Sequence, residues 1–546
     1  MGKRLKLHST SRRFLLLMTA LLLFASTPAY AGAQSTPAAS PTGPQVGEGY
    51  VPFRFDETVT ITMMATVRSQ EAGPPPADWE WLQLVRDELN IDVQIQWITN
   101  ASEYTPTLRT RAAANDLPDV FTSDLATTAL LVDQGLAGDW NPLLQYMPTY
   151  VRDRQVTELA PIGTFDGILA SLVTKNADPF KGVVAIRQDW LDKLGLEVPT
   201  TTEEFLAVAQ AFTTQDPDGN GSADTYGFTG SINSDGFIAG IGGLSSTGAG
   251  FTGIGGAFGD TAPWTVTEDG GIEFRAVTEE HRQYLEFLNQ LQAAGVIDPD
   301  WGSQDSLDMW AKWKAGRIGI LFEDWCALFC VQGYGEFKAA NPEGVYTPIQ
   351  PPVGPDGLSM AGERSNVGMQ YGISQNAVDN GKGEAVARLL EWINGPGYLP
   401  TVHGPQEGRD WERNAEGNIL QIKDVKVLQY RQLTGWALIG SPEELIARYE
   451  SITTYPDGQV LDVYNVLDYC GQYPLSDTTQ WFALPPHPAE TYADFIRTQA
   501  EAEYAFVSGE RSFDEWDSYV ESLNSVGLEN WTTLAEERAR ELGIIQ

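Results

Sequence analysis

Strand-like and helix-like segments alternate from the start of the folded chain. Residues 59–64 alternate as a half-buried strand does, residues 79–89 place apolar side chains at helical spacing, and residues 91–98 alternate again. The same succession continues over residues 104–134 with a helix, a short buried strand and another helix. Alternating units of this kind predict a mainly parallel sheet covered by helices, which is an α/β fold.

Later segments extend this pattern over the rest of the chain. Residues 183–186 and 318–322 have the composition of buried strands, and residues 278–293 form a long amphipathic helix pattern. From Ala489 to the end the pattern is mostly helical. A chain of about 500 folded residues is too long for one hydrophobic core, so we expect at least two lobes.

The first residues have the features of an export signal. Several basic residues precede an apolar run from Phe14 to Phe24, and small residues follow at Ala29 and Ala31. The apolar run is too short to cross a bilayer of about 30 Å as a helix. Residues 1–31 are therefore predicted to be a signal peptide, and the mature protein is expected in the periplasm or at the cell surface.

The segment after the signal has the composition of a flexible tether. Residues 32–50 are rich in Ser, Thr, Pro, Ala and Gly, and folded structure is expected to begin near Val51. A bacterial lipoprotein would carry a cysteine just after its signal, whereas the first cysteine here is Cys326. Lipid attachment at that position is therefore not expected.

The charge of the chain limits its partners. It carries 73 acidic against 35 basic residues, for a formal net charge of −38. Phosphate-rich partners require basic surfaces, so nucleic acid is not expected to bind. The same charge offers no basic patch for acidic sugars.

An acidic, glycine-rich loop at residues 216–224 has the spacing of a cation-binding loop. Oxygen-bearing groups occupy the first, third, fifth, seventh and ninth places of an EF-hand-type calcium loop, the seventh through its main-chain carbonyl. These residues are Asp216, Asp218, Asn220, Ser222 and Asp224. The twelfth place, which usually holds a bidentate Glu, is Gly227. The sequence predicts a calcium site, with a solvated acidic turn as the alternative.

Three cysteines permit one internal disulfide. Cys326 or Cys330 could pair with Cys470, which would join distant segments, or the first two could pair with each other, which would be strained on one helix. The sequence does not choose between these pairings. A buried disulfide is expected rather than a metal-binding or nucleophilic role.

The order of motifs resembles the type 1 extracellular solute-binding proteins that feed ABC importers, in particular the long members that include LipO-like and alginate-binding proteins. The resemblance spans nearly all of the mature chain and is carried by a series of short motifs in a fixed order. They are residues 108–121, 186–196, 199–205, 216–228, 277–280, 287–289, 295–299, 316–320, 407–411 and 510–516.

This resemblance implies a two-lobed periplasmic-binding-protein fold of type II, with the ligand held between lobes joined by hinge strands. It also implies delivery of the solute to the transmembrane subunits of an ABC permease and a structural calcium ion at the acidic loop. The protein is expected to be a monomer. The lobes expected from it are residues 51–170 plus 348–400 and residues 171–347 plus 401–546.

The expected ligand is a carbohydrate, most simply an oligosaccharide. Sugar binders combine flat aromatic rings with carboxylates, amides and arginines, and open α/β sheets bind ligands at the carboxyl ends of their strands. Aromatic residues in loops and polar residues just after predicted strands are therefore candidates for ligand binding. They are Trp325, Asp324, Trp264, Trp411, Asp124, Thr66 and Arg68. For the tryptophans, packing in the core is the alternative, and Arg187 with Asp189 is expected to be a surface pair.

The competing class is a secreted glycoside hydrolase that uses two carboxylates. The sequence has many acids but no compact motif that selects a pair, and it lacks the His-Glu-x-x-His and Gly-x-Ser-x-Gly motifs of zinc peptidases and serine hydrolases. The run 248–253 matches a dinucleotide fingerprint without the strand that should precede it. We therefore expect a binding protein rather than an enzyme.

Overall fold

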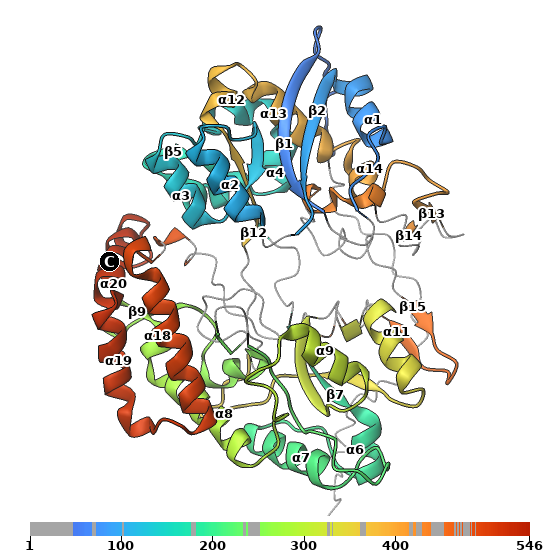
Figure 1. Ribbon diagram of the computed structural model, residues 1–546, viewed down its shortest axis with the longest axis vertical. Helices are drawn as coiled ribbons and strands as arrows, with labels where there is room; N and C mark the ends of the chain where they lie inside the picture. Colours follow the sequence, from blue (N-terminus) through green and yellow to red (C-terminus); the bar gives the residue numbers. More distant parts are fainter. Residues whose placement is uncertain are drawn as a thin grey trace, which may run out of the picture. The chain divides into compact units, whose positions relative to one another are not determined.

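Five strands from both halves of the chain form the first sheet of the computed structural model (Figure 1). Their order is β2-β1-β3-β12-β6, and they are β1 (Val59–Thr66), β2 (Ile91–Ile98), β3 (Val120–Thr122), β6 (Ser171–Lys175) and β12 (Val367–Ile373). β1 is parallel to β2 and β3, whereas β12 is antiparallel to β3 and β6. The sheet is thus mainly parallel, as predicted, with one reversed strand.

The structure describes most of the chain beyond residue 46. The described ranges are 47–67, 73–100, 103–175, 182–232, 236–238, 252–324, 328–329, 331–360, 367–413, 419–421, 429–437, 452–462, 466, 469, 472, 481, 483–485 and 487–546. No helix in these ranges is long and apolar enough to cross a membrane.

Helices cover both faces of the first sheet. They are α1 (Glu80–Leu89), α2 (Tyr104–Ala113), α3 (Leu125–Asp133), α4 (Pro148–Asp153), α5 (Val156–Gly163), α12 (Gln375–Asp379), α13 (Gly383–Ile393) and α14 (Tyr398–Val402), with the 3-10 helix η2 (Asn141–Tyr146). Successive side chains of a strand point to opposite faces. Met63 of β1 accordingly packs in one core with Trp81 of α1, and Met64 packs in another with Leu108 of α2.

The second sheet has three antiparallel strands in the order β10-β7-β11. They are β7 (Gly182–Arg187), β10 (Ile320–Asp324) and β11 (Tyr346–Ile349). β7 lies in the middle and is buried on both faces. Val184 and Ile186 face one core, and Val183 and Ala185 face another. The predicted strands are confirmed, but their pairing is antiparallel.

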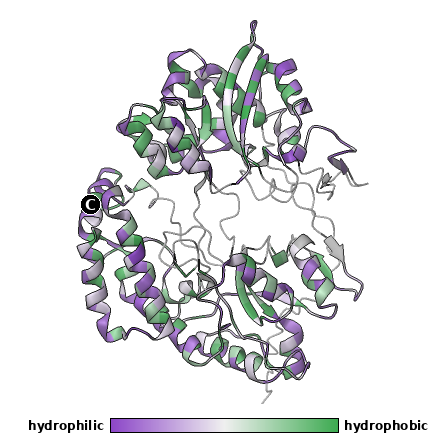
Figure 2. Ribbon diagram, viewed as in Figure 1, coloured by the Kyte–Doolittle hydropathy of each residue, from purple (hydrophilic) through white to green (hydrophobic). Residues whose placement is uncertain are grey.

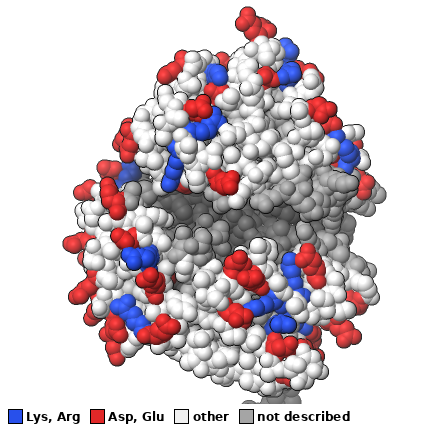
Figure 3. Space-filling view, in the orientation of Figure 1, with Lys and Arg blue, Asp and Glu red and all other residues white. Residues whose placement is uncertain are grey.

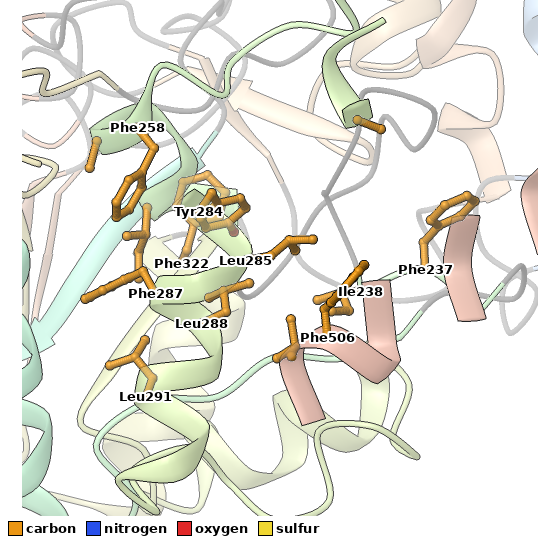
Figure 4. Packing of buried hydrophobic residues seen from close by; sticks show 14 of the residues in the cluster. Phe237, Ile238, Phe258, Tyr284, Leu285, Phe287, Leu288, Leu291, Phe322 and Phe506 are labelled. Atoms are coloured by element: carbon orange, nitrogen blue, oxygen red, sulfur yellow. The ribbon is translucent and has the colours of Figure 1, made fainter. Parts of the chain in front are cut away.

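Long helices enclose this second sheet. They are α6 (Gln188–Leu194), α7 (Thr202–Thr214), α8 (Glu279–Ala293), α9 (Ser306–Lys314), α11 (Val331–Ala340), α18 (Ala489–Ser508), α19 (Trp516–Ser525) and α20 (Leu528–Glu541), with the 3-10 helices η3 (Thr252–Phe258), η4 (Arg275–Val277) and η8 (Phe513–Glu515). In Figure 2 these helices carry hydrophobic residues on one side and hydrophilic residues on the other. Figure 4 shows Tyr284 and Phe287 of α8 turned toward Phe258, with ring centroids 6.0 and 5.5 Å from it.

Short hairpins and turns complete the described elements. The hairpins pair β4 (Thr164–Phe165) with β5 (Ile168–Leu169), β8 (Trp264–Val266) with β9 (Ile272–Phe274), β13 (Trp411–Arg413) with β14 (Ile419–Gln421) and β15 (Ile452–Thr454) with β16 (Val460–Asp462). Two further 3-10 helices are η5 (Gln429–Arg431) and η6 (Thr434–Trp436).

The chain changes between the two sheets at points that differ from the predicted lobe boundaries. β6 lies in the first sheet, although the first lobe was predicted to end at residue 170. Leu433 and Trp436 pack in the core of the first sheet, although residues beyond 400 were assigned to the second lobe. Strand pairing and packing between distant segments decide these assignments, and neither can be read from local pattern.

Arg187 is buried, in contrast to the predicted surface pair. Its side chain is 4% exposed, and the guanidinium donates from Nε and Nη2 to the Asp189 carboxylate at 2.8 and 2.7 Å. It also lies over the Trp190 ring, 4.3 Å from the centroid. Arg187 is the last residue of β7, and its guanidinium lies among the rings of Trp190, Phe337 and Tyr346 instead of in solvent.

Candidate binding site and cation loop

The acidic loop connects α7 to a segment that is fixed against the second sheet. Asp216, Gly219 and Gly221 have positive φ angles of 47°, 73° and 79°. Glycine adopts this backbone conformation without strain, which lets the loop curl tightly. After the loop, Tyr226 and Phe228 form β-bridges that hold the chain in place. Gly219 and Gly221 therefore allow the tight curl of this loop.

Asn220 draws two of the carboxylates together. Its Nδ2 donates to Asp218 Oδ2 at 2.7 Å and to Asp224 Oδ1 at 3.1 Å, while its own Oδ1 accepts from the Ser222 main-chain N–H at 2.6 Å. Asp216 Oδ2 accepts from the Gly221 N–H at 3.1 Å. Side chains from the first, third, fifth and ninth places thus converge inside one short loop.

The loop has acceptor capacity left over. Asp216 Oδ1 is buried and accepts no hydrogen bond from the described residues. A hydrogen bond with Asp218 lowers the pKa of Asp216, whereas partial burial, followed by the neighbouring Asp216 and Asp224 carboxyls, raises the pKa of Asp218. Crowded carboxylates with an unused oxygen fit a hard divalent cation.

The geometry does not assemble a complete ligand set. Across the described ranges, no three His, Cys, Asp or Glu side chains are grouped closely enough to hold a metal ion. The calcium site therefore stays a prediction. In the loop, the Asn220 amide donates its hydrogens to the Asp218 and Asp224 carboxylates. A bound ion would instead require the Asn220 side-chain oxygen as a ligand.

Gly227 occupies the twelfth place for a packing reason. A Cβ atom added there would lie 2.2 Å from the Ala209 carbonyl oxygen of α7, so this position tolerates no side chain. The Gly227 N–H donates to Thr213 Oγ1 of the same helix at 2.9 Å. The missing Glu thus reflects direct contact between the loop and α7.

Thr66 and Asp124 lie at the carboxyl ends of neighbouring strands of the first sheet, as predicted. Thr66 is the last residue of β1, and Asp124 follows β3. Asp124 also caps α3, because its Oδ1 accepts from the Thr127 N–H at 2.6 Å and its Oδ2 accepts from Thr127 Oγ1 at 2.9 Å. The carboxylate is exposed, but its orientation is fixed by the helix.

The reversed strand brings two further residues to this edge that the sequence did not indicate. Because β12 is antiparallel to β3, its first residues lie beside the last residues of β3. The Ser123 N–H donates to the Gln370 carbonyl at 3.2 Å, and Met369 is 37% exposed. Their position depends on pairing between distant segments, for which the local sequence carries no signal.

Asp324 ends β10 at an edge of the second sheet, opposite Gly182 at the start of β7. The preceding residue, Glu323, is 3% exposed and accepts a hydrogen bond from Trp310 Nε1 of α9 at 2.7 Å. Trp310 was not predicted. The predicted residues Trp325 and Arg68 lie outside the described residues, as do the three cysteines.

Two predicted aromatic residues lie in the interior. Trp264 is 3% exposed, with its ring centroid 4.9 Å from that of Trp531 and 5.4 Å from that of Phe274. Trp411 is 7% exposed and donates from Nε1 to the Gly404 carbonyl at 3.1 Å. Both rings have a packing role here, which is the alternative that the sequence left open.

Comparison with known proteins identifies the fold and the family of this chain. The sequence profile described as bacterial extracellular solute-binding protein matches residues 77–399. The fructooligosaccharide ABC transporter substrate-binding protein FusA of Streptococcus pneumoniae is 24% identical over 95% of this chain and 97% of its own length.

Two solved structures share the architecture. One is an EF-hand mutant of FusA in complex with fructo-nystose, with a TM-score of 0.64, 20% identity and coverage of 89% of this chain and 99% of that chain. The other is the alginate-binding protein AlgQ2 without calcium ion, with a TM-score of 0.61, 17% identity and coverage of 89% and 98%. These likenesses confirm the type II periplasmic-binding-protein fold. The relatives are substrate-binding proteins and not enzymes, and the chain belongs to the bacterial extracellular solute-binding protein family.

Proposed function

We propose that this protein is the exported solute-binding component of an ABC importer and that it captures a neutral oligosaccharide between its two lobes. The observation that carries the proposal is the similarity to a fructooligosaccharide-binding protein over nearly the whole length of both chains. Local likeness would support the fold alone, whereas a match along both lobes supports a shared mode of solute capture. The protein acts as a monomer and delivers the solute to a membrane permease.

Each lobe contributes one edge of a sheet to the proposed site. The first contributes Thr66, Arg68 and Asp124, and the second contributes Asp324 and Trp325. Carboxylates and hydroxyls at strand ends can accept and donate hydrogen bonds around a sugar ring, while an aromatic ring covers its apolar face. A solute that touches both edges favours the closed arrangement of the lobes, because only that form contacts it from two sides.

Charge favours a neutral sugar over a uronate. The formal net charge of −38 repels polyanions, and in Figure 3 basic side chains on the face shown lie among acidic ones. The polar side chains proposed for the site include two aspartates. An alginate-like ligand would need these carboxylates to be offset by cations, so a neutral fructooligosaccharide fits the composition better.

The acidic loop is proposed to hold a structural calcium ion. Asp216, Asp218, Asn220 and Asp224 would bind it through side-chain oxygens and Ser222 through its carbonyl, with the Asn220 amide turned so that its oxygen faces the ion. Such an ion would neutralise crowded carboxylates and fix the loop against α7. It would supply stability and no chemistry.

Isothermal titration calorimetry with the mature protein tests the function. We expect saturable binding of nystose, a neutral fructan tetrasaccharide, and no binding of alginate or galacturonate oligomers at the same concentrations. Binding of the uronates alone would overturn the neutral class while leaving the solute-binding role. Absence of binding across fructans, uronates, N-glycan fragments and milk oligosaccharides would contradict the carbohydrate proposal.

A further inference from the structure

We propose that Trp310 is a ligand-stacking residue of the second lobe and that Glu323 is the residue that positions it. The inference rests on the proposed oligosaccharide-binding function, since it assigns a specific platform within that site. Trp310 lies on α9, and Glu323 lies on β10 directly before Asp324, the strand-end residue already proposed for the site.

The position of Trp310 on α9 differs from that of its apolar neighbours. Met309 and Trp313 are fully buried, while Trp310 is only half-buried. α9 thus directs two large side chains into the core and leaves a third at its boundary. A tryptophan that served only to fill the core would gain most from complete burial.

A buried carboxylate fixes the Trp310 ring. Glu323 Oε2 accepts from Trp310 Nε1 at 2.7 Å, and the Glu323 residue is 3% exposed. Burying a carboxylate is costly, and hydrogen bonds to a charged acceptor are stronger than neutral ones. By contrast Trp313 Nε1, in the next turn of the same helix, is buried without a hydrogen-bond partner among the described residues. The Glu323 carboxylate therefore orients the Trp310 indole, although Trp313 shows that a tryptophan of this helix can pack without such a partner.

The surroundings limit how the ring can be used. Lys314 Nζ lies over the Trp310 ring at 5.6 Å from the centroid and forms an ion pair with Glu336 at 2.6 Å. The Lys314 ammonium group lies over one face of the Trp310 ring, and Glu323 accepts the hydrogen bond from the indole nitrogen at the edge of the ring. Trp310 is partly exposed, and Glu323, which accepts the hydrogen bond from its indole nitrogen, directly precedes Asp324 at the end of β10. An aromatic ring that a hydrogen bond holds in one orientation suits the apolar face of a pyranose or furanose ring.

Paired substitutions separate the stacking role of Trp310 from the positioning role of Glu323. Trp310→Leu removes the ring, and Trp310→Phe keeps a smaller ring without the N–H group. Glu323→Leu removes the acceptor, whereas Glu323→Gln keeps an amide oxygen that can accept from Nε1. If Glu323 acts through Trp310, its Leu variant should match Trp310→Leu and its Gln variant should retain binding.

Trp301 supplies a matched control. It is 3% exposed, donates from Nε1 to Gln292 Oε1 at 3.0 Å and packs beside Tyr504 of α18. Trp301→Leu therefore removes a hydrogen-bonded indole from the core that contains α8 and α18, whereas Trp310 packs against a different core cluster. Melting temperatures of all variants separate lost folding from lost binding.

The test is calorimetric titration with nystose, accompanied by intrinsic tryptophan fluorescence. We expect Trp310→Leu and Glu323→Leu each to weaken nystose binding by about tenfold or more, as truncation of a buried contact residue does, with Glu323→Gln within about threefold of wild type. Trp301→Leu should bind normally, and the fluorescence change on binding should be lost in Trp310→Phe. Normal nystose binding by Trp310→Leu would overturn this inference and leave the proposed function intact. Failure of the wild-type protein to bind any oligosaccharide would overturn both.

Discussion

Two regions of the second lobe gather acidic side chains, and they stabilise the carboxylates in different ways. In the acidic loop, the Asp218 and Asp224 carboxylates share the hydrogens of the Asn220 amide near the surface. In the interior, His281 lies between Asp260 and Glu503, with Nδ1 at 2.9 Å from Asp260 Oδ2 and Nε2 at 3.3 Å from Glu503 Oε1. The first cluster is proposed to bind a cation from solvent, whereas the second contains its own.

The contrast shows in the pKa values. Burial by itself lowers the pKa of His281, but the charges and hydrogen bonds of Asp260 and Glu503 outweigh it and raise the pKa to about 9. In the loop, burial and like charges raise the pKa of Asp218. The interior cluster is therefore sensitive to loss of a proton, and the loop is sensitive to gain of one.

Removal of the internal cation should have the largest effect. His281→Leu would leave the buried Asp260 and Glu503 side chains without their imidazolium partner, and breaking a buried ion pair in this way costs about 3 to 5 kcal/mol. Urea denaturation at pH 7 measures the loss. The control is Arg282→Gln on the same helix, which removes exposed pairs with Glu279 and Glu286 and should cost less than about 1 kcal/mol. Equal losses of unfolding free energy in His281→Leu and Arg282→Gln would contradict the proposed importance of the buried cluster.

Alkaline pH should weaken the wild-type protein through the same cluster. Because the folded pKa of about 9 lies above the unfolded value of 6.5, the stabilisation is complete below pH 6.5 and is lost as pH rises through 9. The linkage amounts to about 3 kcal/mol. Urea midpoints between pH 6 and pH 10 should fall for wild type, and His281→Leu should lack that part of the decline. Parallel profiles for the two proteins would assign the alkaline loss to other groups.

Calcium should stabilise the protein through the acidic loop. At a calcium concentration about a hundredfold above its Kd, binding to the folded state alone contributes about 3 kcal/mol, so the melting temperature should rise with calcium and fall with chelator. The double variant Asp216→Asn, Asp218→Asn should lose this response. Glu203→Gln, which changes an exposed acid of α7, should keep it. A calcium response that survives in the double variant would place the ion elsewhere.

Acid should weaken calcium binding by a smaller amount. Since the pKa of Asp218 is raised, its protonation begins to compete with the ion at a higher pH than for a free aspartate. Calcium affinity measured by titration at pH 7 and pH 5 should fall severalfold. Asp218→Asn should bind calcium more weakly at both pH values and show less difference between them. An affinity independent of pH in the wild-type protein would indicate that Asp218 is not a ligand.

The sequence predicted the local elements well because their periodicities are local. β1, α1, β2 and α8 follow from alternating or helical spacing of apolar residues, and the turn at 216–224 follows from its glycines. The lobe that the resemblance assigned to residues 348–400 contains β12, whereas the placement of β6 in the first sheet was not predicted. β6 joins this sheet by pairing with β12, which in turn pairs with β3 across a long separation in sequence.

The candidate site residues show the same difference between local features and contacts of distant segments. Thr66 and Asp124 lie where predicted because a strand end is a local feature. The number of aromatic residues did not reveal which rings are buried, so Trp264 and Trp411 were candidates although they pack in the interior. Trp310 and His281 were missed because Glu323, Asp260 and Glu503 reach them from other segments of the chain.

Small-angle X-ray scattering of the mature protein, with and without saturating oligosaccharide, tests the central claim that one solute bridges two lobes. We expect a smaller radius of gyration when an oligosaccharide is bound, with nystose as the first probe. An unchanged radius of gyration at concentrations where calorimetry shows saturation would contradict it, since the solute would then contact one lobe alone.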